Sequence, residues 1–247
     1  LLLLLLLLAV APAVPAAERS LAKRLKPMLT RHKGQVSAMV KNLKTGETFT
    51  WRAEAPMPTA SLIKLAVLVE VYRQVADGDV ELDDRLKLTE KDKVPGSGVL
   101  RVHFSDGTRL SLRDAVRLMI AISDNTATNL VLDRIGLKAT NRTMKRLGFP
   151  ETRIHAKVFR REPSLDPERS QRFGLGSTTA AEMVGLLEKM YAGELVSAKA
   201  SREMLEHLRA CESTERIPRF LPEGTVVAHK TGSVARVRTD AGIIESP

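Results

Sequence analysis

The stretch Ser61-Leu62-Ile63-Lys64 places a hydroxyl and an amine three residues apart, at the start of a long apolar segment. Two more short stretches follow it along the chain, Ser123-Asp124-Asn125 and Lys230-Thr231-Gly232. A serine with a lysine three residues later is common by chance, but all three stretches in this order are not. Together they supply a nucleophile, proton carriers, a relaying hydroxyl and a cationic anchor, which are the parts of an acyl-transfer site.

The apolar periodicity after Ser61 predicts a helix to Ala76 that ends at Gly78. Ser61 and Lys64 would then face the same side of that helix. A lysine can take the proton of a serine only if burial or a neighbouring cation lowers its pKa. The apolar neighbours and Lys230 would provide both conditions. Taken alone, the motif more often represents a helix-capping serine followed by a solvated lysine.

The other two stretches complete the chemistry. Ser123 can pass a proton to the leaving nitrogen, and Asn125 offers both a donor and an acceptor to a substrate amide. Asp124 would face elsewhere and serve the structure. Lys230 and Thr231 can hold a substrate carboxylate by charge-assisted hydrogen bonds.

The backbone around the third stretch would complete the cleft. Gly232 allows a substrate backbone to lie close to the strand. We expect the backbone N–H groups of Ser61 and Ser233 to form an oxyanion hole. Arg236 and Arg238 are both candidates for a second carboxylate contact, and the sequence does not choose between them.

Strand patterns lie at both ends of the chain and helical patterns between them. Residues 36–40, 48–51, 225–230 and 237–244 read as strands, whereas 86–110 and 157–177 read as irregular. This pattern predicts an α+β fold, with an antiparallel sheet of N- and C-terminal strands, flanking helices and an inserted all-helical region.

From about Glu18 onward the chain resembles the class A β-lactamases and penicillin-binding proteins, which share these three motifs. The resemblance implies the β-lactamase/transpeptidase-like fold, in which a further strand and helix would follow Pro247. It also implies a loop, called omega, in which a glutamate positions the water that hydrolyses the acyl-enzyme. Arg160, Glu162, Pro163 and Leu165 match that loop, so Glu162 is the expected general base.

Two positions depart from the family pattern. Asp166 stands where the family has an asparagine that shares the water, so it is a candidate water-positioning residue that would bring two carboxylates together. Gly176 stands where the family has an aspartate that pairs with the equivalent of Arg160. Both departures weigh against fast deacylation.

Composition limits the other functions. The net charge is +10, but the positive residues are scattered and only 4% of residues are aromatic, which argues against a nucleic-acid partner. The five histidines form no metal motif, so neither a metal nor another cofactor is expected. The single cysteine, Cys211, is expected in a helix as a packed or idle thiol.

Residues 1–17 read as a signal peptide that lacks its beginning, because eight leucines lead into small residues suited to signal peptidase. Residues 18–247 then form a single domain. We expect a secreted monomer, periplasmic or extracellular, with no membrane span in the mature chain. Its expected substrates are β-lactam antibiotics or peptidoglycan-like peptides.

Three hypotheses follow. The first is a class A-type serine β-lactamase, acylated at Ser61 with Lys64 or a Glu162-bound water as the base, and deacylated by Glu162. The second is a penicillin-binding D,D-peptidase-like hydrolase with slow deacylation, in which Glu162 is incidental. The third is a sensor domain that captures β-lactams or cell-wall peptides covalently.

Overall fold

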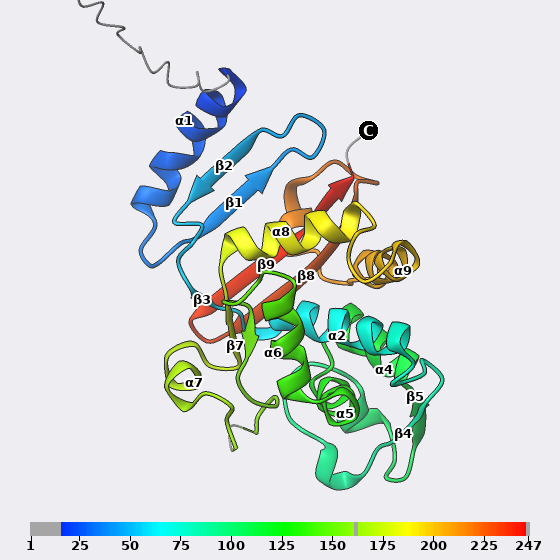
Figure 1. The fold of residues 1–247 in the computed structure, drawn as a ribbon. Coiled ribbons are helices and arrows are strands. Elements are labelled where there is room, and N and C mark those ends of the chain that lie inside the picture. Colours follow the sequence, from blue (N-terminus) through cyan, green and yellow to red (C-terminus); the bar gives the residue numbers. More distant parts are fainter. Residues whose placement is uncertain (1–15, 161–162, 246–247) are drawn as a thin grey trace, which may run out of the picture.

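Two antiparallel hairpins lie near the two ends of the part of the chain that the computed structural model describes, residues 16–160 and 163–245 (Figure 1). The first pairs β1 (Ala38–Lys41) with β2 (Thr48–Trp51), beside the helix α1 (Ala16–Arg31). The second pairs β8 (Val226–Val234) with β9 (Val237–Glu245). The described strands do not hydrogen-bond between these hairpins, so they remain separate two-stranded sheets, bridged by a helix that contacts both β1 and β9.

That bridging helix is α8. All described helices after α1 lie between the two hairpins in the sequence. Figure 1 shows α2, α4, α5 and α6 gathered on one side of the β8–β9 hairpin. The helices after α1 are α2 (Lys64–Asp77), α3 (Leu100–His103), α4 (Leu112–Ala121), α5 (Asn125–Ile135), α6 (Leu137–Arg146), α7 (Pro167–Phe173), α8 (Ala180–Tyr191) and α9 (Ala198–Arg209). The mixed α+β architecture predicted from the sequence is therefore confirmed.

Helix α2 is the centre of the core. Every residue from Leu62 to Tyr72 is buried, and α2 packs against α4, α5, α6 and α9. A helix that is covered on all sides can tolerate apolar residues all round, which explains the long apolar run. Full burial of each such side chain stabilises the fold by about 1.5–3 kcal/mol. The C-terminus of α2 is closed by Gly78, at φ 78°.

Two regions that the sequence suggested were irregular contain regular elements. Residues 86–110 include the pairing of β4 (Arg85–Lys87) with β5 (Arg109–Ser111), the 3₁₀ turn η2 (Glu90–Asp92) and α3. Residues 157–177 include α7 and most of β7 (Gly176–Thr178), which lies between β3 (Met57–Pro58) and β6 (Arg153–Ile154). These elements are short, so they show too little periodicity to be recognised.

The start of α4 is marked by a capping residue. The Ser111 hydroxyl accepts a hydrogen bond from the Asp114 backbone N–H at 3.0 Å. The expectation that Cys211 lies in a helix is wrong, because α9 ends at Arg209. No described helix has the length and apolarity needed to cross a membrane.

Candidate active site

Ser61 lies in a short 3₁₀ turn, η1 (Ala60–Ile63), which leads directly into α2. The residue before the turn is fixed from two sides. The Thr59 backbone N–H donates to the Gly176 carbonyl at 3.0 Å, and the Thr239 hydroxyl donates to the Thr59 carbonyl at 2.8 Å. The turn that carries Ser61 is therefore held between β7 and β9.

Lys64 is the first residue of α2 and is fully buried. Its Nζ donates to the Ser123 carbonyl at 2.7 Å, to the Ser123 hydroxyl at 3.1 Å and to Asn125 Oδ1 at 3.0 Å. Burial, together with the charge of Lys230, lowers the pKa of Lys64 well below its ordinary value, and Asp124 opposes this only in part. The lowered pKa makes the neutral amine, the form that a proton acceptor needs, easier to reach at Lys64.

The segment 123–125 is shaped by a buried carboxylate. Asp124 caps α5 by accepting from Ala127 N at 2.8 Å, and its other oxygen accepts from Val99 N and Leu100 N. The structural role that the sequence suggested for Asp124 is confirmed. Its neighbour Ser123 has a φ of 59°, a left-handed conformation that is unusual for a residue other than glycine.

Lys230 and Gly232 lie on β8, which packs against η1. Lys230 is 1% exposed, and its Nζ donates to the Thr231 carbonyl at 2.9 Å. Burial lowers the pKa of Lys230 to about 8, although the charges of Cys211 and Asp240 oppose the shift. A Cβ on Gly232 would lie 2.3 Å from the Thr59 carbonyl oxygen, so only glycine lets the two elements approach this closely.

These groups meet at one cleft. A cavity of about 330 Å³ is bordered by Ser61, Ser97, Ser123, Lys230, Thr231 and Ser233, among others. This volume is within the range of small-molecule sites. Lys64 reaches the cleft through its hydrogen bond to Ser123. The structure therefore brings together the predicted nucleophile, the predicted base, the relaying hydroxyl and the cationic anchor.

Sequence reasoning missed a cation, Arg216, that contacts a residue bordering this cleft. Arg216 donates to the Thr239 carbonyl at 3.2 Å and also to the Ser233 hydroxyl. Of the two arginines singled out earlier, Arg238 donates to carbonyls of its own turn, Val237 among them, and Arg236 is exposed. Arg216 belongs to no recognisable sequence motif. Its position is visible only in the structure, where its segment packs against β9.

Glu162, the predicted general base, lies outside the described residues, as does its neighbour Arg161. The segment on either side is described. The Arg160 guanidinium donates to the Lys91 carbonyl, and the Asn129 side chain bonds both the N–H and the carbonyl of Val158, at 2.9 and 3.0 Å. The chain leading to Glu162 is therefore tied to η2 and α5.

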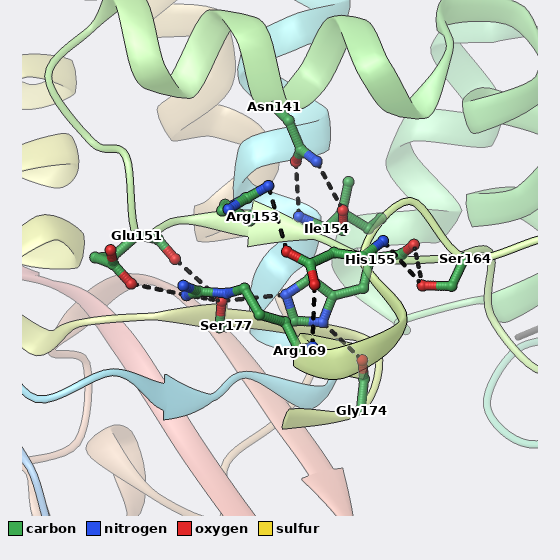
Figure 2. Close-up of polar contacts among 10 residues, drawn as sticks. Asn141, Glu151, Arg153, Ile154, His155, Ser164, Arg169, Gly174 and Ser177 are labelled. Carbon is green, nitrogen blue, oxygen red and sulfur yellow. Dashed lines mark hydrogen bonds and ion pairs between the residues drawn. The ribbon is translucent and has the colours of Figure 1, made fainter. Parts of the chain in front are cut away.

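Gly176 leaves no room for the family's aspartate. A Cβ at this position would lie 2.8 Å from Ile63 Cγ1 and 2.9 Å from the Arg153 carbonyl oxygen. No carboxylate at 176 pairs with Arg160, and other polar contacts, which Figure 2 shows, join residues before the loop to residues in and after it.

The fully buried His155 is the centre of these polar contacts (Figure 2). Its Nδ1 lies 2.9 Å from the Gly174 carbonyl and its Nε2 lies 3.2 Å from the Ser177 hydroxyl. Its own carbonyl accepts from Leu165 N at 2.8 Å. Burial lowers the pKa of His155, so the ring is neutral at pH 7 and links both ends of the 164–177 segment.

Asp166 takes part in the same network. One oxygen of Asp166 accepts from Arg169 N at 3.1 Å, which caps α7, and the other lies 3.5 Å from Arg153. The Arg169 guanidinium in turn donates to Glu151 and to Ser177, both at 2.7 Å. Asp166 therefore anchors the loop, and its suggested role in positioning water stays a prediction.

The fold and this cleft define a serine hydrolase of the β-lactamase type. A protein-family model described as the β-lactamase enzyme family matches residues 20–247. The chain therefore belongs to the β-lactamase enzyme family, and it is an enzyme of that family.

Solved structures agree with this assignment. A β-lactamase from Sphaerobacter thermophilus is 33% identical over 94% of this chain and 82% of its own, with a TM-score of 0.77. A protein named PBP-A is 26% identical over 92% of this chain and 82% of its own, with a TM-score of 0.79. The TLA-1 extended-spectrum β-lactamase shares the fold at 22% identity, covering 93% and 86% of the two chains, with a TM-score of 0.80.

Proposed function

We propose that this enzyme hydrolyses β-lactams through an acyl-enzyme on Ser61. The observation that carries the proposal is the position of Lys64, which is fully buried and donates to Ser123 and Asn125 beside the cleft that Ser61 borders. The β-lactamase name of the Sphaerobacter relative supports the same reaction.

Acylation follows from this arrangement. The Ser61 hydroxyl gives its proton to Lys64, or to water on Glu162, and its oxygen attacks the β-lactam carbonyl. The carbon–nitrogen bond of the ring breaks, and Ser123 passes a proton to the released nitrogen. The N–H groups of Ser61 and Ser233 stabilise the oxyanion, a contribution of about 3–4 kcal/mol for each donor.

Substrate binding and hydrolysis use the remaining residues. Lys230 and Thr231 bind the substrate carboxylate, Asn125 binds the side-chain amide, and Gly232 leaves room for the substrate along β8. Water then attacks the ester with Glu162 as general base, a contribution of about 10²–10⁴-fold. We also propose secretion of a single domain to the periplasm or the medium.

A second candidate is a D,D-peptidase-like enzyme that deacylates slowly. Gly176, which carries no carboxylate to pair with Arg160, favours it. So does the similarity to PBP-A, because a PBP-A variant with 26% identity to this chain is described as an acyl-enzyme complex with penicillin G.

One experiment separates the two candidates. The purified protein is mixed with a chromogenic cephalosporin, and both turnover and intact protein mass are followed. Rapid turnover with a transient adduct supports the β-lactamase. A stable adduct with little turnover supports the peptidase-like enzyme. Absence of both signals contradicts the two proposals together.

The pH dependence of the reaction follows from the two lysines. Lys64 must be neutral to accept a proton, so kcat/KM rises with pH as this lysine loses its charge. Lys230 must be charged to hold the carboxylate, and its pKa is lowered to about 8. We therefore expect kcat/KM for a penicillin to fall as pH rises through about 8. A pH profile that stays flat from 7 to 10 contradicts this role of Lys230, and a penicillin methyl ester serves as the control.

A further inference from the structure

Three side chains from separate segments gather at the β8–β9 hairpin, which also carries Lys230. His229 on β8 is 1% exposed, and its Nδ1 lies 2.9 and 3.1 Å from the two carboxylate oxygens of Asp240 on β9. The half-buried Cys211, which follows α9, is close enough to the same imidazole to raise its pKa. We refer to Cys211, His229 and Asp240 as the triad.

The backbone is adapted to hold this imidazole. His229 is paired with Gly242 across the β8–β9 hairpin. A Cβ on Gly242 would lie 2.3 Å from the Cβ of His229, so a larger residue would displace the ring. Among the described residues, no cluster of His, Cys, Asp and Glu is arranged to hold a metal ion, and we interpret the triad as a group of mutually stabilising charges.

The charges follow from the contacts. Although burial opposes it, the hydrogen bond to Asp240 and the nearby Cys211 raise the pKa of His229 to about 9, so the ring is an imidazolium at pH 7. The imidazolium lowers the pKa of the Cys211 thiol, again against burial. The triad therefore combines a carboxylate, an imidazolium and an acidified thiol.

The triad is linked to the cleft through residues that neighbour it in the sequence. Asp240 Oδ2 accepts from the backbone N–H of Ile217 at 3.0 Å, which fixes the residue after Arg216. His229 directly precedes Lys230. Cys211 directly precedes Glu212 and Ser213, which border the cleft.

The triad also affects the pKa of Lys230 through electrostatic interactions. The charged and titratable groups that act on it come from each surrounding segment: Lys64 on α2, Cys211 after α9, Arg216 before the turn η3 (Ile217–Phe220), and Asp240 on β9. Cys211 and Asp240 favour the charged ammonium, whereas Arg216 disfavours it.

We propose that the triad positions Arg216 and holds the Asp240 carboxylate near Lys230, and so determines how tightly the cleft binds a substrate carboxylate. The inference rests on the proposed function, in which Lys230 holds that carboxylate. Asp240, His229 and Cys211 act through Arg216 and Lys230 and are positioning residues.

The test compares Asp240→Asn, His229→Gln and Cys211→Ser with the wild type, using a penicillin and its methyl ester. A charge-assisted hydrogen bond contributes about 1.5–3 kcal/mol, so we expect the KM of the acid to rise about 10-fold or more in the first two variants, with kcat within about twofold. The KM of the ester stays unchanged. Cys211→Ser keeps a hydrogen-bonding group and gives a smaller rise.

The pH profile separates positioning from a loss of packing. Asp240 raises the pKa of Lys230, so Asp240→Asn moves the alkaline fall of kcat/KM to lower pH. The control is Glu188→Gln, which breaks an ion pair with Lys41 on β1. We expect the control to leave both the KM and the pH profile unchanged.

A double variant tests the route through Arg216. If Asp240 acts through this guanidinium, Arg216→Gln combined with Asp240→Asn raises the KM of the acid by less than the product of the two single effects. The proposal is overturned if the effects of the two substitutions on KM multiply. It is also overturned if KM rises equally for the acid and the ester, or if the alkaline fall of kcat/KM does not move in Asp240→Asn.

An NMR titration needs neither turnover nor a variant that folds well. The wild-type His229 ring is expected to stay protonated up to about pH 9. A ring that titrates near its ordinary value overturns the inference even if the enzyme is active. If the wild type is neither acylated nor active, the proposed function fails, and this titration alone decides whether the triad exists.

Discussion

Replacing Ser61 with alanine is expected to abolish both turnover of a chromogenic cephalosporin and the mass increase of the covalent adduct. In the proposed mechanism, the Ser61 oxygen forms the bond to the substrate. Loss of the nucleophile in a serine hydrolase costs on the order of 10⁶-fold in kcat. The measurement is a stopped assay together with intact mass spectrometry.

The matched control is Ser105→Ala, which removes a hydroxyl from an exposed residue outside the cleft. It should keep wild-type turnover. An adduct of unchanged mass on the Ser61→Ala protein would show that another residue is the nucleophile, and the assignment of the cleft would have to be abandoned.

Replacing Glu162 with alanine is expected to leave acylation measurable and to trap the acyl-enzyme. Without a general base for water, deacylation should slow by about 10²–10⁴-fold. The adduct would then persist for minutes to hours and be seen as a stable mass increase after one equivalent of substrate.

The companion variant is Glu168→Gln, which changes an exposed carboxylate in the first turn of α7 without touching the predicted base. Its turnover should match the wild type. Unchanged turnover in Glu162→Ala would refute the role given to Glu162. An adduct that is already stable in the wild type would instead favour the slow, peptidase-like enzyme.

The catalytic cluster could be predicted because its spacing survives small changes of local structure. Ser61 lies in a 3₁₀ turn rather than in the predicted α-helix, but residues three apart lie on the same side in both. Asp124 was expected to be structural, and the structure shows that it caps α5. Gly232 was predicted to make room for a substrate, and the structure shows that it lets β8 approach Thr59 closely.

Contacts between distant segments could not be predicted in the same way. Arg216 reaches Ser233 only because its segment lies along β9, and His229 meets Asp240 only in the observed strand register. One signal was present and not used: Asp166-Pro167 is a typical helix start, with a capping carboxylate before a proline.

The backbone of Ser123 has a consequence for the evolution of this enzyme. Its left-handed conformation, at φ 59°, costs about 1–3 kcal/mol relative to an ordinary one, and a glycine would avoid most of that cost. A glycine, however, would remove the hydroxyl that Lys64 contacts. Selection for heat resistance and selection for turnover therefore oppose each other at this single position.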